Sequence, residues 1–457
     1  MTTLGVDLGT SGVKALSLDA SGQVVGRGSA GYPVAAPRAG WAETDPEDWW
    51  RAVVAAVRTA VAGRRVTAIG LSGQMHGVVL ASAAGAPLRP ALLWPDRRAS
   101  LRPYRALPAG LRERLANPLF PGMAGPMLCW LARHEPAAYG RARWALAPKD
   151  WLRMRLTGRA AAEPSDASAT LLYDVPADGW AYGVVEALGL RADLLPDLVP
   201  SAAVAGALTG AAAADLGLLP GIPVVAGAAD AAAGIVGTGL TDPGEVQLTV
   251  GTGGQLVTLL GPDPAPDPEL RTHRYRAATG RGWYALAATL NAGLALDWVR
   301  DLLGLSWAEL YAAGPARPGD PVFVPYLAGE RTPVMDAGAR AHWVDLASDH
   351  DRAALARAAV EGVCFALADA LEALPASTGP LRLAGGGSTD PAFRQVLADV
   401  LGRPLRAVDV PDASARGAAL LATPVRAPAP EPVLVAEPAA DVSARRARFR
   451  KVAQSAS

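Results

Sequence analysis

Gly5-Val6-Asp7-Leu8-Gly9-Thr10-Ser11-Gly12-Val13-Lys14 is the stretch around which the rest of the chain is organised. An apolar run carries a carboxylate into a turn of glycines and hydroxyls, and residues 13–18 resume the apolar pattern, which predicts a β-hairpin. Glycines in the turn let backbone N–H groups approach an anion, and Asp7 can hold a metal ion, usually through water. The turn therefore suits a nucleotide phosphate with Mg²⁺, although a plain hairpin loop explains the same residues.

The same pattern returns in the second half of the chain. Residues 245–250 predict a strand, Gly251-Thr252-Gly253-Gly254 follows as a turn, and residues 256–258 predict the returning strand. The repetition predicts two domains that each open with a phosphate-binding hairpin, one on either side of a cleft. Chance is the alternative, because the chain contains 49 glycines.

Length, charge and cysteine content narrow the class of protein. A chain of 457 residues is long for one hydrophobic core, so we expect two or three domains. The 43 basic and 43 acidic residues balance, so the chain has no excess of positive charge to attract nucleic acid or an anionic membrane. Small ligands fit this composition better than either of these partners. Cys129 and Cys364 stand far apart in apolar contexts, so neither a disulfide framework nor a metal knuckle is indicated. We expect a cytoplasmic protein with no exported or membrane-inserted segment.

The first candidate ligand-binding loop follows a predicted helix and a predicted strand, which come after the first hairpin. Thr44 or Asp45 caps a predicted helix that begins at Pro46 and ends before Gly63, and residues 66–71 form a buried strand. The loop that follows this strand contains Met75 and His76, and such loops hold ligands in α/β folds. His76 can hydrogen-bond to sugar hydroxyls while Met75 packs against carbon, but a structural histidine explains the position equally well.

Three further carboxylates follow apolar strands or lie in polar loops. Asp96 follows the run at residues 92–95, Asp166 lies in a loop before residue 171, and Asp230 follows the apolar strand at residues 222–226. Small side chains around Asp230 leave room for a ligand to reach it. Each aspartate has a simpler explanation, because aspartate often caps a turn or a helix.

The C-terminal half contains two polar segments and ends in a basic tail. In the loop at residues 325–333, Glu330 and Arg331 are candidates for pairing with each other. The triple glycine at residues 385–387 lies between a predicted strand at 381–384 and a helix that starts at Pro391, and it permits the flat approach of a ring such as adenine, although tight packing also requires glycine. After residue 420 the chain becomes Pro-rich and then basic, which predicts a loosely held terminus rather than a nucleic-acid arm.

In order and spacing these motifs resemble those of the FGGY carbohydrate kinases, and among them the xylulokinases. The resemblance runs from Gly5 to about Leu420 and rests on the opening hairpin, Ser-Gly-Gln-Met-His-Gly at 72–77, the run ending at Asp96, Ala-Pro-Lys-Asp-Trp-Leu at 147–152, Asp230, Gly251-Thr252, Tyr-Leu-Ala-Gly-Glu-Arg-Thr-Pro at 326–333 and the triple glycine. It implies an α/β fold of two ribonuclease-H-like domains with actin-like ATPase architecture around a central cleft. Three segments are expected. Residues 1–238 form a domain with the sugar site and the catalytic aspartate, residues 239–423 form a domain with the ATP site, and residues 424–457 form a tail.

The resemblance also implies an activity and roles for individual residues. The expected reaction transfers a phosphoryl group from ATP, with Mg²⁺, to D-xylulose, giving D-xylulose 5-phosphate, and the expected partners are sugar and ATP alone. Asp230 corresponds to the general base and Asp7 to the Mg²⁺-associated aspartate. The residues implied for the sugar are Gln74, Met75, His76 and Asp96. The residues implied for ATP are Thr10, Ser11, Lys14, Gly251, Thr252, Gly385, Gly386 and Gly387.

Two departures from the family pattern keep other functions open. Ala231 stands where the pattern has an asparagine that contacts the sugar, and Met127 stands where it has a lysine. The alternatives are a kinase for another ketose or polyol, and a sugar-binding homologue that has lost turnover. The sequence does not fix the oligomeric state, and a homodimer stays open.

Overall fold

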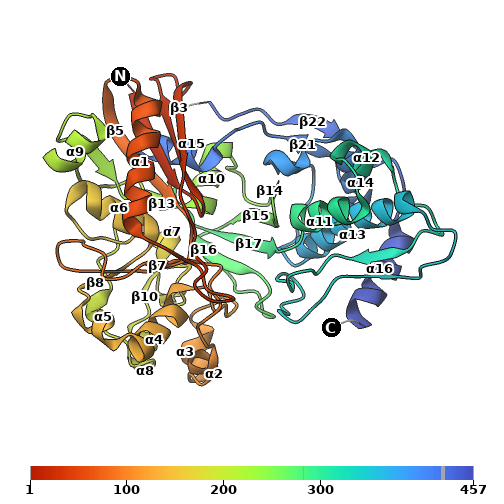
Figure 1. Cartoon of the computed structure of the whole chain (residues 1–457), viewed down its shortest axis with the longest axis horizontal. Coiled ribbons are helices and arrows are strands. Elements are labelled where there is room, and N and C mark those ends of the chain that lie inside the picture. Colours follow the sequence, from red (N-terminus) through yellow and green to blue (C-terminus); the bar gives the residue numbers. More distant parts are fainter. Residues whose placement is uncertain (1, 281, 424–427, 456–457) are drawn as a thin grey trace.

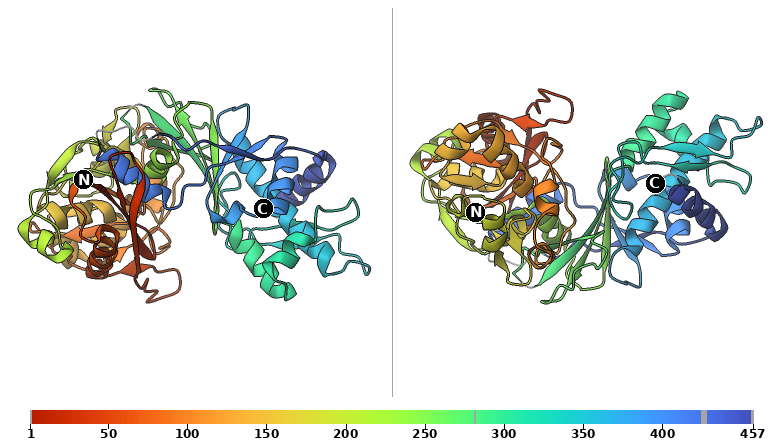
Figure 2. Two further views of the ribbon diagram at one scale, coloured as in Figure 1. Left: turned by 90° about the horizontal axis from the view of Figure 1, so that it is seen from above. Right: turned by 90° about the horizontal axis from the view of Figure 1, so that it is seen from below.

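The computed structural model describes residues 2–280, 282–423 and 428–455, and each half of the chain builds one large mixed sheet (Figure 1). The first sheet contains, in order, β11 (Val204–Ala207), β12 (Pro223–Val225), β5 (Val66–Gly73), β1 (Thr2–Leu8), β2 (Gly12–Leu18) and β3 (Val24–Gly31), and β13 (Ala228–Ala229) also pairs with β5. The second contains β16 (His273–Arg276), β17 (Trp283–Thr289), β15 (Gly254–Leu260), β14 (Val246–Val250), β20 (Leu381–Ala384), β21 (Leu405–Ala407) and β22 (Val433–Ala436). Figure 2 shows the two lobes that result.

Both sheets follow one plan. β1 pairs antiparallel with β2 and parallel with β5, and β14 pairs in the same way with β15 and β20. β3 and β17 extend the two hairpins as antiparallel neighbours. The two predicted hairpins are confirmed, and so is the α/β architecture of two similarly built domains.

Helices cover both sheets, and the start of α1 agrees with the cap signal in the sequence. α1 (Pro46–Val61) begins where Asp45 accepts a hydrogen bond from the Glu47 N–H at 3.0 Å, and its buried face packs on the first sheet. The other helices of the first half are α2 (Arg102–Arg105), α3 (Ala109–Glu113), α4 (Ala124–His134), α5 (Pro136–Arg141), α6 (Pro148–Thr157), α7 (Pro164–Ala167), α8 (Tyr182–Ala187), α9 (Gly210–Leu216) and α10 (Asp230–Thr238). Those of the second half are α11 (Gly293–Leu303), α12 (Trp307–Ala312), α13 (Arg352–Glu372), α14 (Pro391–Leu401), α15 (Ala413–Leu421) and α16 (Ser443–Ser455).

None of the helices in the described part of the chain combines the length and the apolar character that a membrane span requires. Short paired strands complete the fold: β4 (Glu43–Thr44) with β7 (Ala91–Leu92), β6 (Val79–Ala81) with β8 (Trp144–Leu146), β9 (Tyr173–Asp174) with β10 (Gly179–Trp180), and β18 (Val322–Val324) with β19 (His342–Val344).

One helix of the second half packs on the sheet of the first half. α15 comes from the second half but lies on the first sheet, where Figure 1 shows it beside α10. A Cβ atom on Gly5 of β1 would lie 2.0 Å from the Ala415 carbonyl oxygen, so only glycine admits this approach. α10 in turn shares a hydrophobic cluster with β15 and β17. One helix that follows residue 238, the expected domain boundary, therefore covers the sheet that precedes this boundary.

The prediction of a loosely held tail is wrong for residues 428–455, while 424–427 and 456–457 lie outside the described residues. β22 adds to the second sheet beside β21, and α16 packs Phe449 against Phe365 with no exposed surface. Arg445 pairs with the buried Glu361 at 2.6 Å. The basic residues that suggested a free tail instead neutralise carboxylates of the second half.

Candidate active site

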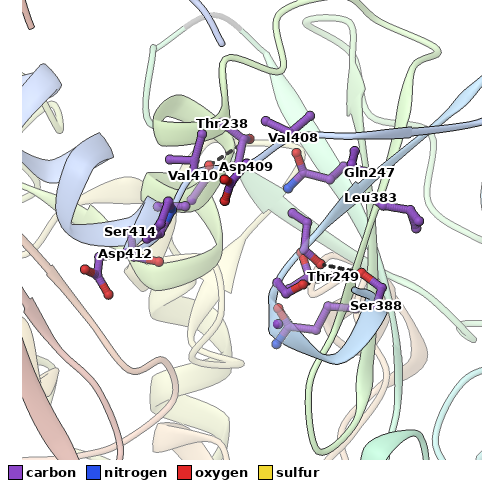
Figure 3. Close-up of a pocket in the computed structure, with 18 of the residues that line it drawn as sticks. Thr238, Gln247, Thr249, Leu383, Ser388, Val408, Asp409, Val410, Asp412 and Ser414 are labelled. Atoms are coloured by element: carbon purple, nitrogen blue, oxygen red, sulfur yellow. Dashed lines mark hydrogen bonds between the residues drawn. The ribbon is translucent and has the colours of Figure 1, made fainter. Parts of the chain in front are cut away.

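A cavity of about 690 Å³ lies between the two halves, and both contribute to its walls (Figure 3). The first half supplies carboxylates at the end of β1 and at the start of α10. β14 and β15 supply amide and hydroxyl side chains, and the loop after β21 supplies further carboxylates. The polar residues that line it are Asp7, Lys14, Asp230, Thr238, Gln247, Thr249, Gln255, Ser388, Thr389, Arg394, Asp409, Asp412 and Ser414.

Asp7 presents an unsatisfied carboxylate to this cavity. Its Oδ1 atom is buried and has no hydrogen-bond partner among the described residues. Burial raises the pKa of Asp7 from 3.8 to about 6, against the opposing effects of Ser72 and Lys14. In the described residues no cluster of three or more side chains is suited to hold a metal by itself. Asp7 fits Mg²⁺ held partly by substrate phosphates and water, which is how this ion is usually bound.

Asp230 is the first residue of α10, and its carboxylate also faces the cavity. Oδ1 accepts a hydrogen bond from the Ala231 N–H at 2.7 Å, and no partner of Oδ2 is found in the described residues. Burial and the nearby charge of Asp7 raise the pKa of Asp230 from 3.8 to about 7. A carboxylate with a free oxygen and a pKa near neutrality suits a general base.

His76 lies outside the walls of this cavity and lines a second one of about 30 Å³. It adopts a left-handed conformation with φ 71°, and its Nδ1 atom lies 2.8 Å from the Ala169 carbonyl oxygen. A carbonyl can only accept, so Nδ1 carries the proton. Burial lowers the pKa of His76 to about 4, which keeps the ring neutral and leaves Nε2 as an acceptor for a hydroxyl. Met75 is 7% exposed and packs in one cluster with Ala228 and Ala229 next to Asp230.

Two residues expected at the sugar form hydrogen bonds within the chain. Asp96 is fully buried, and both of its carboxylate oxygens accept hydrogen bonds from Arg98, at 2.9 and 2.7 Å. It also accepts from the Ala42 N–H, and a contact between Asp96 and the sugar stays a prediction. Gln74 is 1% exposed and donates to the Gly9 carbonyl at 3.2 Å, which ties it to the first glycine turn.

The residues expected at ATP divide into two groups. Lys14, Gly385 and Gly386 line the cavity, whereas Thr10, Ser11, Gly251, Thr252 and Gly387 do not. A Cβ on Gly387 would lie 2.7 Å from the Val250 carbonyl oxygen, so packing against β14 requires that glycine. Nothing lies within 4 Å of a Cβ at Gly386, where the backbone is open to a ligand.

Comparison with known proteins agrees with this geometry. The N-terminal domain of the FGGY family of carbohydrate kinases matches residues 2–237, and its C-terminal domain matches residues 246–424. The chain belongs to the FGGY family of carbohydrate kinases. It is therefore a phosphotransferase that acts on a carbohydrate with ATP. The recognised motifs and this membership agree, so the resemblance seen in the sequence is confirmed.

Individual relatives of this FGGY kinase carry several names. The xylulose kinase of Escherichia coli K12 is 36% identical over 416 residues, which cover 88% of this chain and 85% of that protein. The glycerol kinase of Alkalilimnicola ehrlichii is 34% identical over 447 residues, which cover 92% of this chain and 89% of that protein. The crystal structure of a xyloylose kinase from Brucella ovis superposes with a TM-score of 0.89, at 34% identity, over 100% of this chain and 98% of that one.

A buried ion cluster under the FGGY kinase site was not predicted from the sequence. Lys149 is fully buried, and its Nζ atom lies 2.5 Å from Asp150, 3.6 Å from Glu163 and 3.5 Å from Asp166. Burial would lower the pKa of Lys149, but these carboxylates outweigh it and raise the pKa. The signals in the sequence were the Lys149-Asp150 pair, in a motif quoted for the resemblance, and Asp166 as a candidate carboxylate.

This cluster connects to the backbone beside Asp230. Glu163 accepts a hydrogen bond from the Ser165 hydroxyl at 2.6 Å, and the same hydroxyl accepts from the Ala229 N–H at 2.9 Å. The two buried oxygens of Asp166 have no hydrogen-bond partner among the described residues, and burial together with neighbouring carboxylates raises its pKa well above the ordinary value, against the opposing charge of Lys149. α7 therefore holds the residue that precedes Asp230.

Proposed function

We propose that this FGGY kinase phosphorylates D-xylulose with ATP, giving D-xylulose 5-phosphate and ADP. The observation that carries the proposal is the Asp230 carboxylate, which has a free oxygen and a pKa of about 7 in a cavity that both halves line. Similarity to proteins named xylulose kinase supports the choice of sugar.

In the proposed mechanism Asp230 accepts the proton of the attacking sugar hydroxyl. The His76 Nε2 atom accepts a hydrogen bond from another hydroxyl and orients the sugar. Asp7 would hold Mg²⁺, which neutralises charge on the transferring phosphoryl group when it is bound. Lys14 and the open backbone at Gly386 lie on the cavity wall, where they can contact the nucleotide.

Two features favour a different acceptor. Ala231 offers a methyl group where the family pattern has an amide, and it lines the cavity next to Asp230. The similarity to a protein named glycerol kinase is nearly as high as that to the xylulose kinase. The second candidate is therefore a kinase for another ketose or polyol. The third, a homologue without turnover, is disfavoured because the carboxylates of Asp7 and Asp230 are both present.

Steady-state ADP release, coupled to a colour reaction, separates these candidates. Pentuloses, hexuloses, pentitols and glycerol are supplied at equal concentration with and without Mg²⁺. We expect the highest kcat/KM with D-xylulose and no turnover without the metal. A polyol that exceeds D-xylulose contradicts the choice of sugar, and ADP release from none of the acceptors contradicts the kinase. We also propose that the protein is cytoplasmic. A homodimer is compatible with the proposal, and light scattering after gel filtration tests it.

A further inference from the structure

Arg331 extends from the loop at residues 325–333 towards the first half of the molecule. Its guanidinium carbon lies 5.0 Å from the ring centre of Phe120, which belongs to the first half. Its Nη2 atom lies 2.7 Å from Nε2 of His273 on β16. Arg331 therefore stands where the two halves meet.

The guanidinium of Arg331 forms no ion pair in the described residues, although the charge of Glu330 still acts on it. Glu330 is adjacent in sequence, but its carboxylate accepts hydrogen bonds from the Leu290 N–H, the Asn291 amide and the Arg331 N–H. No carboxylate in the described part of the chain forms an ion pair with the guanidinium, so the expected pairing of the two side chains is wrong. A half-buried charge without a counter-ion is unfavourable unless a ligand satisfies it.

The neighbours of Arg331 also have unsatisfied polar atoms. Arginine only donates, so His273 accepts at Nε2 and carries its proton on Nδ1. This N–H and the Tyr275 hydroxyl are buried without partners among the described residues, and both side chains are 1% exposed. A polar site made of one guanidinium and unpaired donors indicates that a ligand with acceptor oxygens belongs there.

A series of rings connects this site to His76. The His273 ring stacks on Tyr275 at 5.1 Å, and Tyr275 meets the His76 ring edge-on at 6.0 Å. The charge of Arg331 lowers the pKa of both histidines, after the larger effect of burial. The contacts from His76 through Tyr275 and His273 to Arg331 therefore link the two halves, and His76 and Arg331 offer opposite hydrogen-bond chemistry, an acceptor and a donor.

We propose that Arg331 binds the sugar from the second half by donating to an oxygen that can only accept, the keto oxygen of an open-chain ketose. The inference rests on the proposed function and deepens it, because it names the feature of the substrate that the site selects. A ketose presents this oxygen beside a hydroxyl that can donate to His76. The carboxylate of an aldonate presents the same acceptor chemistry, whereas a pentitol has a hydroxyl at that carbon.

The test compares Arg331→Gln with the parent on three ligands: the ketose, the pentitol that matches it at the other carbons, and an aldonate. KM or the inhibition constant is measured for each, together with the KM for ATP. We expect the ketose KM to rise by about tenfold to a hundredfold, as for a lost hydrogen bond to a charged group. The KM for ATP stays unchanged, and the constant for the pentitol rises by a smaller factor, because the hydroxyl at that carbon can also accept from the guanidinium. Arg340→Gln is the matched control, because Arg340 is exposed and bonds only to backbone carbonyls in its own loop.

Each outcome separates the binding role from a structural one. An equal rise for ketose and pentitol, or no rise for either, overturns the assignment. If the parent turns over the aldonate and not the ketose, and Arg331→Gln loses the aldonate, then the proposed substrate fails while Arg331 keeps its role. If Arg331→Gln does not fold, Arg331→Lys retains the charge, and it must show a ketose-specific rise in KM, because an ammonium lacks the planar geometry of the guanidinium.

Discussion

Replacing Asp230 with asparagine should lower activity and raise stability. Burial raises the pKa of Asp230 from 3.8 to about 7, so the folded protein binds this proton more tightly than the unfolded chain does. Stability of the parent therefore falls as the pH rises from about 4 to about 7 and is level above that. A difference of one pH unit corresponds to about 1.4 kcal/mol, so the neutral asparagine should stabilise the protein by at most about 4 kcal/mol above pH 7.

The same change removes the proton acceptor. Asparagine keeps the shape of the side chain and the hydrogen bond to the Ala231 N–H, but it cannot take a proton from the sugar. We expect kcat to fall by about 10² to 10⁴ while the KM for sugar changes little. In the parent, kcat/KM should rise with pH and level off above about pH 7 as Asp230 ionises.

The two effects are measured by coupled ADP release and by urea unfolding at pH 5 and pH 8. Asp45→Asn is the control, because this residue caps α1 and asparagine caps a helix about as well as aspartate. A variant with parental kcat rules out the general base. A variant less stable than the parent at pH 8 rules out the buried charge as the cause of the raised pKa.

Three further changes test other parts of the structure. Asp7→Ala should abolish Mg²⁺-dependent ATP hydrolysis with an unchanged circular dichroism spectrum, and parental turnover would contradict a metal role for Asp7. His76→Asn, which tolerates the positive φ, should raise the sugar KM far more than the ATP KM because the Nε2 acceptor is lost, whereas equal rises would indicate a structural histidine. Phe449→Ala should cost about 3–5 kcal/mol in urea unfolding, since a fully buried ring is removed, and a tail without packing would show no loss.

Local chemistry explains which predictions were confirmed. The hairpins at residues 2–18 and 246–260 depend on glycine turns between apolar runs, and α1 depends on a cap and a proline at its start. These signals act over a few residues, so they are visible in the sequence alone. The position of Asp230 is also a local signal, because a residue that directly follows a strand must lie at the end of the sheet.

Contacts between distant segments decided the rest. The sequence placed Asp96 after a strand, but only the fold brings Arg98 and the Ala42 N–H to its carboxylate. α15 crosses to the first sheet because glycines such as Gly5 admit a helix backbone at close range, and no local pattern states which helix that is. The environment of Arg331 was also decided by the fold, because the carboxylate of the adjacent Glu330 accepts hydrogen bonds from the Leu290 N–H and the Asn291 amide. A residue's type limits what it can bind, and the tertiary structure determines which partners remain for it.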